Sequence, residues 1–351
     1  MYKQILRPLA FCLDGERVHH IMMWWASRLL RCSVIRALFR SLYGRRKGEV
    51  ERDVMGLHFH GLVGFAAGFD KGGELADRLE AVGYAFMEVG TITPLPQPGN
   101  PKKRIFRLVK DRALINRMGF NSEGIEVVTE RLKRRKQRAI PISGNLGKNT
   151  ATPNEHAAKD YTLGLEKIYD YADFFVVNVS CPNVKDLRAL QEENTLSPII
   201  EALVAVRARQ ADYKPILLKL GADPTEEELI YTVKTALRQG IDGFVVSNTT
   251  TRREGLQTTP EELATIGAGG LSGKPLHERA LQAVRCVRKA AGAGIPIIGV
   301  GGIFSGADAL AMLQAGASLI EVYTGVIYEG PALARKINKY LRQHMQEIPE
   351  W

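Results

Sequence analysis

A cysteine placed between two asparagines is the feature of this sequence best suited to chemistry. Residues 174–177 are four consecutive apolar residues, a pattern typical of a buried strand, and Asn178 follows them directly. Cys181, Pro182 and Asn183 come next, and because proline has no N–H to give to a sheet, the strand must end near Pro182. The thiol is therefore expected at a strand-to-loop junction, where it acts as a base or packs as an inert buried cysteine.

Comparable apolar runs recur along the chain, and we expect eight strands, at 61–67, 85–89, 140–145, 174–179, 215–220, 243–247, 295–300 and 318–323. Helical segments are expected between them, at 198–209, 225–239, 276–290 and 306–315. This alternation predicts an α/β fold, and eight units in a chain of 351 residues favour a (β/α)8 TIM barrel. A doubly wound open sheet is the alternative, but its Gly-x-Gly-x-x-Gly turn after an early strand is not found.

The carboxyl ends of barrel strands carry the chemistry of this fold. The expected ends hold no Asp/Glu pair, histidine cluster or Ser-His-Asp set, which disfavours paired-carboxylate hydrolysis and metal catalysis. Gly301-Gly302 and Thr324-Gly325 follow the last two strands, where barrels hold phosphate on backbone N–H groups, although tight turns also use glycine. Four asparagines, Asn116, Asn178, Asn183 and Asn248, carry amides that match a flat ring with C=O and N–H groups. Two lysines, Lys71 and Lys219, suit a substrate carboxylate or an anionic cofactor ring.

Most of the net charge of +10 lies at the N-terminus, because residues 1–48 hold ten Lys and Arg against two acidic residues. The rest of the chain is nearly balanced, which argues against binding of nucleic acid, and the basic run 131–138 is expected to be a solvated helix face. Residues 1–43 have an amphipathic helical pattern. Their longest uncharged run, 18–27, is too short for a spanning helix of about 20 residues. This pattern is compatible with two interpretations: a segment that lies in a membrane interface, and a helical hairpin that packs on the protein itself.

Two further features bear on metals and redox state. The four cysteines, Cys12, Cys32, Cys181 and Cys286, are scattered without metal-ligand spacing, which favours a reducing compartment. His58-Phe59-His60 alternates like a strand, but with no third ligand expected nearby it is predicted to be a surface hairpin, and no metal site is predicted.

Several motifs resemble those of the dihydroorotate dehydrogenase family, the flavin enzymes of pyrimidine biosynthesis, and in particular its membrane-associated, quinone-dependent class. They lie at 66–71, 90–94, 96–101, 115–121, 147–149, 247–250, 270–273 and 299–303, so the resemblance covers nearly the whole chain. Residues 13–19 resemble the helix that opens the quinone tunnel of that class.

The resemblance implies that dihydroorotate is oxidised to orotate, with FMN as hydride acceptor and a membrane quinone as final acceptor. It implies FMN contacts at Ala67, Gly68, Phe69, Asp70, Lys71, Thr91, Asn145, Asn178, Lys219, Ser247, Gly273, Gly302, Tyr323 and Thr324. It implies substrate contacts at Lys71, Asn116, Arg117, Met118, Gly119, Phe120, Asn178, Asn183, Asn248 and Thr249. The quinone is expected along His19, Arg107 and Tyr323.

The resemblance also divides the chain into an N-terminal amphipathic helical extension, residues 1–48, and a catalytic barrel, residues 49–351. The extension is expected to bind an anionic membrane surface, which makes the protein a peripheral membrane protein, on the cytoplasmic face of the inner membrane in a bacterium. The same oxidation with fumarate or NAD as acceptor, and a non-catalytic flavin carrier, are the alternatives.

Three positions depart from the family pattern. Cys181 stands where the quinone class usually has serine and the soluble class cysteine, Ser247 replaces a usual threonine, and Lys185-Asp186 replaces a small turn. We predict that Cys181 removes a proton from the ring carbon beside the substrate carbonyl. A thiol suits this role because its ordinary pKa of about 8.5 is far nearer neutrality than that of an alcohol.

Overall fold

Eight parallel strands close into a barrel in the computed structural model, which describes residues 2–76, 78–135, 138–183, 190 and 193–351. Their order around the barrel is β10-β12-β13-β3-β4-β7-β8-β9. The bounds are β3 Val63–Phe65, β4 Phe86–Ile92, β7 Ile142–Leu146, β8 Phe174–Asn178, β9 Ile216–Leu220, β10 Gly243–Val246, β12 Ile297–Val300 and β13 Leu319–Val322. Each strand lies at one of the eight predicted runs, so the predicted (β/α)8 barrel is confirmed.

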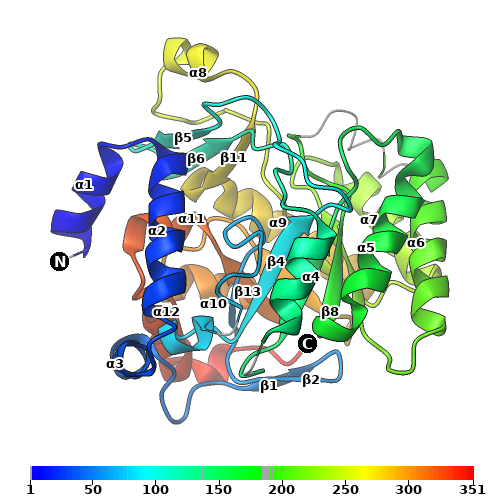
Figure 1. Ribbon diagram of the computed structural model, residues 1–351, viewed down its shortest axis with the longest axis horizontal. Coiled ribbons are helices and arrows are strands. Elements are labelled where there is room, and N and C mark those ends of the chain that lie inside the picture. Colours follow the sequence, from blue (N-terminus) through cyan, green and yellow to red (C-terminus); the bar gives the residue numbers. More distant parts are fainter. Residues whose placement is uncertain (1, 77, 136–137, 184–189, 191–192) are drawn as a thin grey trace.

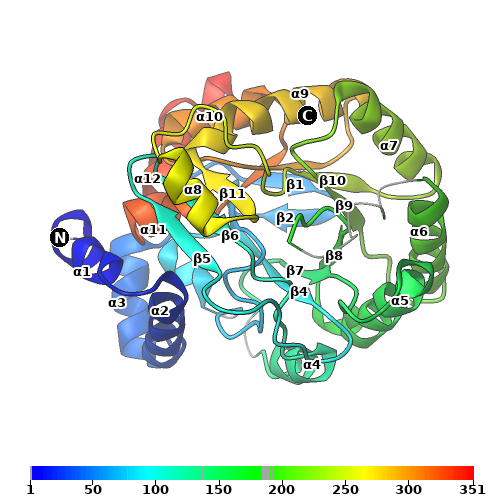
Figure 2. The ribbon, with the colours of Figure 1, turned by 90° about the horizontal axis from the view of Figure 1, so that it is seen from above.

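Helices surround the barrel as a ring (Figure 2) and bury the outer faces of its strands. They are α4 Ile125–Lys133, α5 Ala157–Ile168, α6 Glu193–Ala208, α7 Glu226–Arg238, α9 His277–Ala291, α10 Gly306–Gln314, α11 Thr324–Glu329 and α12 Leu333–Gln343. Short 3-10 turns add η2 Leu79–Val82, η3 Asn154–His156, η4 Tyr169–Tyr171, η6 Lys274–Leu276 and η7 Met345–Glu347. The four predicted helical segments are confirmed as α6, α7, α9 and α10.

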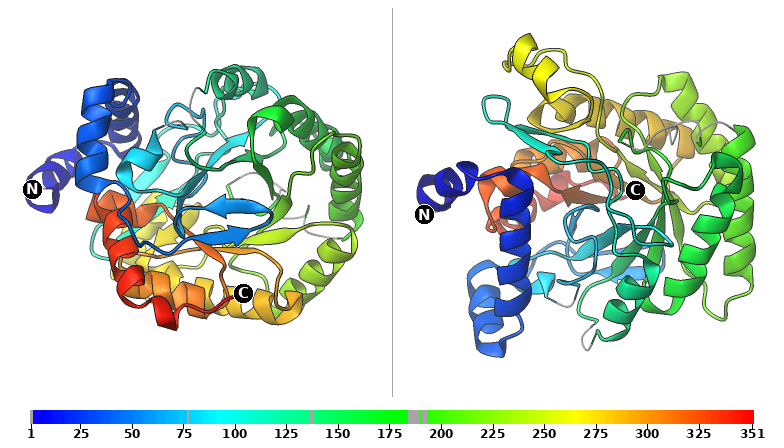
Figure 3. Two further views of the ribbon diagram at one scale, coloured as in Figure 1. Left: turned by 90° about the horizontal axis from the view of Figure 1, so that it is seen from below. Right: turned by 45° about the horizontal axis from the view of Figure 1, so that its top comes forward.

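Aromatic side chains and a hairpin fill the amino end of the barrel. The ring of Phe59 packs edge-on against Phe86, with centroids 5.4 Å apart, and lies 6.4 Å from Phe174. Gly64 makes room for this cluster, because a Cβ there would come within 2.3 Å of the Phe86 ring. Phe59 belongs to the antiparallel hairpin of β1 Arg52–Val54 and β2 Leu57–Phe59, which covers the lower mouth of the barrel (Figure 3, left).

A small antiparallel sheet, which the sequence did not predict, lies over the opposite, carboxyl end (Figure 1, top). It has the order β11-β6-β5, with β5 Ile105–Leu108, β6 Ala113–Asn116 and β11 Gly270–Gly273, and α8 Pro260–Ile266 lies beside it. Because β6 and β11 pair directly, the motifs at 115–121 and 270–273 meet above the strand ends although they are far apart in sequence.

The N-terminal extension is helical, as predicted, and consists of η1 Tyr2–Leu6, a π-helix, α1 Arg7–Phe11, α2 Gly15–Leu29 and α3 Ser33–Tyr43. Asp14 begins α2 by accepting hydrogen bonds from the N–H groups of Glu16 and Arg17, at 3.0 and 3.1 Å. The helices stand outside the ring (Figure 2), with Met23 and Leu30 buried against the body. Among the described helices, none is both long enough and apolar enough to cross a bilayer.

The hairpin predicted for His58-Phe59-His60 is confirmed, but the expectation that no third metal ligand lies nearby is wrong. Glu51 precedes β1. Because Arg52 pairs with Phe59, the carboxylate of Glu51 lies beside both His58 and His60. This third ligand could not be predicted from the sequence, because only the register of the hairpin brings residue 51 close to residues 58 and 60.

Candidate active site

A cavity of about 160 Å³ lies at the carboxyl ends of the barrel strands, beneath the small sheet. Nineteen of the predicted site residues line it, namely Ala67, Gly68, Lys71, Thr91, Asn116, Met118, Gly119, Phe120, Asn178, Cys181, Asn183, Lys219, Ser247, Asn248, Thr249, Gly273, Gly302, Tyr323 and Thr324. The structure therefore gathers most of the predicted site in one place.

Cys181 lies in the wall of this cavity, three residues beyond the end of β8, with 9% of its surface exposed. Two lysines are close enough for their charges to interact with a charge on its sulfur: the partly buried Lys71, from the loop after β3, and the buried Lys219 on β9. Positive charge beside a thiol favours the thiolate, which is the form that accepts a proton.

A chain of hydrogen bonds fixes the amide of Asn178 next to this thiol. The amide donates to Thr91 Oγ1 at 2.9 Å, and Thr91 donates in turn to Asn145 Oδ1 at 2.6 Å. Asn248 donates to Asn178 Oδ1 at 3.3 Å and to Ser180 Oγ at 3.1 Å. Asn145 thus lies behind Thr91 and supports the cavity wall.

A second amide pair joins the loop after β8 to the small sheet. Asn183 donates to Asn116 Oδ1 at 2.8 Å and accepts from the Gly270 N–H at 2.9 Å. Asn100 donates to the Asn183 carbonyl at 3.1 Å. The four predicted asparagines therefore form two hydrogen-bonded pairs that line the same cavity as Cys181. Residues 185 and 186, the other departure from the family pattern in this loop, lie outside the described residues.

Two buried carboxylates beneath the cavity were missed, and the expectation that no Asp/Glu pair lies at this end of the barrel is wrong. Glu88 on β4 accepts from Lys219 Nζ at 2.7 Å and from the Ala67 N–H at 3.1 Å. Glu321 on β13 lines the cavity, and burial together with the neighbouring Glu88 charge raises its pKa well above the ordinary value. Both carboxylates lie within their strands, before the strand ends and following loops at which the site residues were predicted. Because Glu88 is paired with Lys219, and burial beside Glu88 raises the pKa of Glu321, this is not a free acid–base pair.

Two buried hydroxyls at the cavity, those of Ser247 and Thr249, have no hydrogen-bond partner among the described residues. Buried polar groups are nearly always satisfied in folded proteins, so these atoms fit a polar ligand that fills the cavity. Thr324 and Gly325 are the first two residues of α11, so their N–H groups have no acceptor within that helix. Together with Gly302 in the cavity wall, these N–H groups are suited to bind a phosphate.

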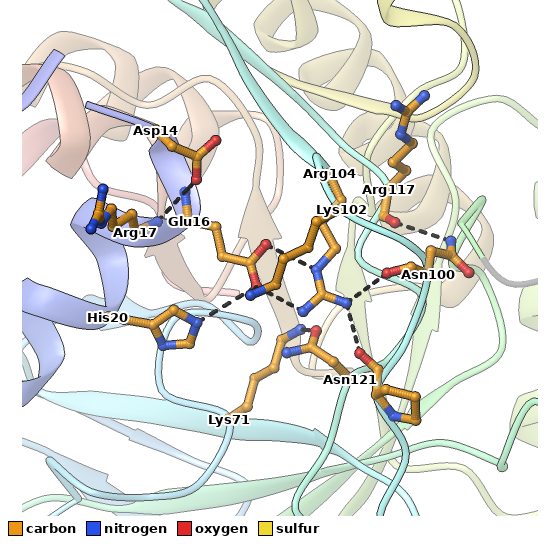
Figure 4. A network of polar contacts seen from close by, with 11 residues as sticks. Asp14, Glu16, Arg17, His20, Lys71, Asn100, Lys102, Arg104, Arg117 and Asn121 are labelled. Carbon is orange, nitrogen blue, oxygen red and sulfur yellow. Dashed lines mark hydrogen bonds and ion pairs between the residues drawn. The ribbon is translucent and has the colours of Figure 1, made fainter. Parts of the chain in front are cut away.

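Lys71 lies on the side of the cavity that faces the N-terminal extension (Figure 4). It donates to Asn121 Oδ1, and burial lowers its pKa to about 8. Above it the carboxylate of Glu16, on α2, forms two hydrogen bonds with Arg104, at 2.7 and 3.0 Å. Burial alone would raise the pKa of Glu16, but Arg104 holds it below the ordinary value. This buried ion pair, which sequence analysis missed, fastens α2 to the wall of the site.

The three predicted quinone residues occupy different places. The ring of Phe69 lies 5.0 Å from His19 on one side and 6.1 Å from Tyr323 on the other, and Tyr323 lines the cavity. Burial lowers the pKa of His19 to about 4, so its imidazole is neutral at physiological pH. Arg107 instead holds the start of the extension, because it donates to the carbonyls of residues 10 and 13.

Three other predicted contacts lie outside the cavity wall. Phe69 packs between His19 and Tyr323, and Asp70 accepts from the N–H groups of Glu74 and Leu75, at 2.9 and 2.6 Å. Arg117 points away and donates to the carbonyls of residues 103 and 266. Asp70 and Arg117 thus hold the loops that carry their neighbours in the site.

Comparison with known proteins gives a consistent result. The family model described as dihydroorotate dehydrogenase matches residues 49–345. A protein of Christiangramia forsetii named dihydroorotate dehydrogenase (quinone) is 44% identical over 97% of this chain and 98% of its own length, and one of Thermobifida fusca with the same name is 42% identical over 97% and 91%. The crystal structure of a DHODH from Eimeria tenella in complex with ferulenol has 36% identity and a TM-score of 0.85, and covers 95% of this chain and 92% of that one.

Proposed function

The chain belongs to the dihydroorotate dehydrogenase family, and we propose that it oxidises (S)-dihydroorotate to orotate and passes the electrons to a quinone. The reaction serves pyrimidine biosynthesis. The observation that carries the proposal is that Cys181 lines one cavity together with two asparagine pairs and with two lysines whose charges reach its sulfur. A base and amide partners at one spot fit a flat heterocycle that must lose a proton.

The oxidation removes a proton and a hydride from adjacent ring carbons, and the chain's residues divide this work. Cys181, as thiolate, takes the proton from the carbon beside the carbonyl and becomes a neutral thiol. The amides of Asn116, Asn183 and Asn248 hold the ring by its C=O and N–H groups, and the Lys71 ammonium binds the carboxylate of the substrate. These contacts fix the reacting carbon near the sulfur, so the chemical step needs little further ordering.

Enzymes of this family use a flavin, and we propose that here it is FMN, which accepts the hydride. The orphan hydroxyl of Ser247 and the N–H groups near Gly302 and Thr324 would hold its ring and phosphate. Lys219 would place a positive charge where reduction leaves negative charge, and its own charge is secured because Glu88 raises its pKa against the lowering effect of burial.

Anaerobic addition of dihydroorotate to the purified yellow protein tests the proposal. The visible flavin absorbance should bleach and stoichiometric orotate should form. A spectrum that stays unchanged would show a flavin carrier instead of an enzyme.

The titration of Lys71 gives the substrate site a pH dependence. Because its pKa is about 8, the ammonium that binds the carboxylate is present below that pH and is lost above it. The affinity for orotate should therefore be level below pH 7 and fall by up to about tenfold per pH unit above pH 8.

Orotate titrations of the wild-type protein, followed by the flavin spectrum, measure this. Lys71→Met should bind orotate weakly at every pH. The matched control is Lys274→Met, because Lys274 pairs with Asp308 at the surface at 3.0 Å. An affinity that declines equally in wild type and Lys71→Met would contradict the assignment.

For residues 1–48 we propose a peripheral contact with an anionic membrane surface, through which quinone enters between the extension and the flavin. Of the 20 large hydrophobic side chains that are exposed in the described part of the chain, 12 lie in this extension, although it is about one-eighth of the length. Trp24 and Trp25 are half exposed, and Arg28 lies over the Trp24 ring at 3.9 Å. Exposed tryptophan and leucine beside arginine is the composition of an interfacial helix.

The double variant Val34→Ser/Leu38→Ser should weaken binding to vesicles of anionic phospholipid at least about tenfold, or about 1.4 kcal/mol. These side chains on α3 are 75% and 56% exposed, so their loss removes membrane contacts and little packing. The matched control is Val127→Ser/Leu163→Ser, an exposed pair on α4 and α5. Co-sedimentation measures both, and equal losses in the two variants would refute the contact.

A further inference from the structure

The hairpin at the amino end of the barrel carries a cluster that the proposed reaction does not use. Among the residues that the structure describes, Glu51, His58 and His60 are the one group of three His, Cys, Asp or Glu side chains whose ligand atoms all lie within 4.8 Å of one another. The hairpin covers the lower mouth of the barrel (Figure 3, left), and the cavity lies at the opposite end. The cluster therefore has no part in the oxidation of dihydroorotate.

The three ligand atoms have the spacing of a tetrahedral metal site. His58 Nε2 lies 3.1 Å from His60 Nδ1 and 3.3 Å from Glu51 Oε2. The other oxygen of the same carboxylate, Oε1, lies 3.6 Å from His60 Nδ1, and one atom from each of the three side chains lies within 4.8 Å of the other two. Nitrogen and oxygen ligands bind Zn²⁺ at about 2.0–2.2 Å, so two corners of a tetrahedron around the ion lie about 3.3–3.6 Å apart. An ion can enter this triangle with only small shifts of the side chains.

A fourth side chain orients the cluster. Asp53 Oδ1 lies 2.7 Å from His58 Nδ1, where it accepts the N–H of that nitrogen and turns the lone pair of Nε2 toward Glu51 and His60. A carboxylate behind a ligating imidazole is the usual outer partner in zinc sites, and it raises the basicity of the ligand. Antiparallel pairing explains the arrangement, because the register places Asp53 directly opposite His58.

We propose that Glu51, His58 and His60 form a binding site for Zn²⁺, with Asp53 as the outer partner and water in the fourth position. All three ligand side chains are between one-third and one-half exposed, so the ion exchanges with solvent. Arg45 contacts Oε1 of Glu51, which leaves Oε2 to the metal. Because Glu51 follows the segment 44–50 that leads from α3, the ion ties this segment to the hairpin and stabilises the entry into the barrel.

Calorimetric titration of the metal-free holoenzyme with zinc chloride tests the site. Wild type should bind one equivalent more than His58→Ala or His60→Ala, and Asp53→Asn should keep the stoichiometry with an affinity about 10- to 100-fold lower. His156→Ala, which removes another exposed histidine, is the matched control and should bind like wild type. Comparison with wild type also cancels zinc bound by the exposed thiols of Cys12 and Cys32.

Thermal unfolding gives a second readout. Zinc should raise the unfolding midpoint of wild type and His156→Ala, and leave that of His58→Ala and His60→Ala unchanged, because only an intact site favours the folded state. Equal stoichiometry in wild type and both variants of the cluster, or no zinc binding by wild type, would overturn the proposal. Bound flavin in each variant shows that it has folded.

Discussion

Replacing Cys181 by alanine should slow the reduction of bound flavin by dihydroorotate by about 10²- to 10⁴-fold, which is the usual contribution of a general base. The flavin should stay bound, because Cys181 is not among its proposed contacts and most of those lie on other strands. Stopped-flow mixing with dihydroorotate under anaerobic conditions measures the rate. Reduction at a near-normal rate would show that the thiol only packs in the wall.

The chain offers a matched control in Cys286, which is also a buried cysteine with 9% exposure but lies on α9, outside the cavity wall. Cys286→Ala should reduce the flavin at the wild-type rate. Cys181→Ser restores the residue usual in the quinone class and should keep measurable activity, with a pH profile shifted upward because an alcohol is a far weaker acid than a thiol. Loss of activity equal to that of the alanine variant would show that the surroundings support only a thiol.

Replacing Lys219 by methionine should lower the free energy of unfolding of the flavin-free protein by about 3–5 kcal/mol. The substitution leaves Glu88, which has 0% exposure, as a buried charge without its 2.7 Å partner. Chemical denaturation measures the loss. The surface pair of Lys274 and Asp308 gives the control, since Lys274→Met should change stability by less than about 1 kcal/mol.

The second carboxyl group in this cluster, that of Glu321, makes the losses expected for Lys219 and for Glu88 unequal. Glu88→Gln should cost less than Lys219→Met, because removal of the Glu88 charge allows Glu321 to ionise and pair with Lys219. The double variant Lys219→Met/Glu88→Gln should recover most of the loss, since it buries no unpaired charge. Equal losses in the two single variants, without recovery in the double variant, would contradict this electrostatic account.

The barrel could be predicted because its strands are buried on both faces and therefore read as continuous apolar runs. All of β8, from Phe174 to Asn178, is buried, and Pro182 after it marks where the strand pattern ends. Pro182 and Asn183 after this strand indicated the position of the site in the sequence. The motifs then supplied the identity of the ligand, which periodicity alone does not contain.

The parts that sequence analysis missed depend on contacts between distant segments. Glu16 pairs with Arg104 across 88 residues, and the small sheet forms because residues 113–116 meet 270–273. Glu88 and Glu321 interrupt apolar runs by one residue each, and their partnership follows from the strand order, since β3 alone separates β4 from β13. A single charged residue inside a buried strand was the available signal, because such a group needs a partner or a function.

Electrons should pass from dihydroorotate through the flavin to quinone, and a double-mixing experiment follows both halves of this transfer. The enzyme is first bleached with one equivalent of dihydroorotate under anaerobic conditions, and is then mixed separately with a ubiquinone analogue, with fumarate and with NAD. The account predicts that the flavin absorbance returns rapidly with the quinone and stays bleached with the other two. Return with fumarate or NAD, and not with the quinone, would contradict it.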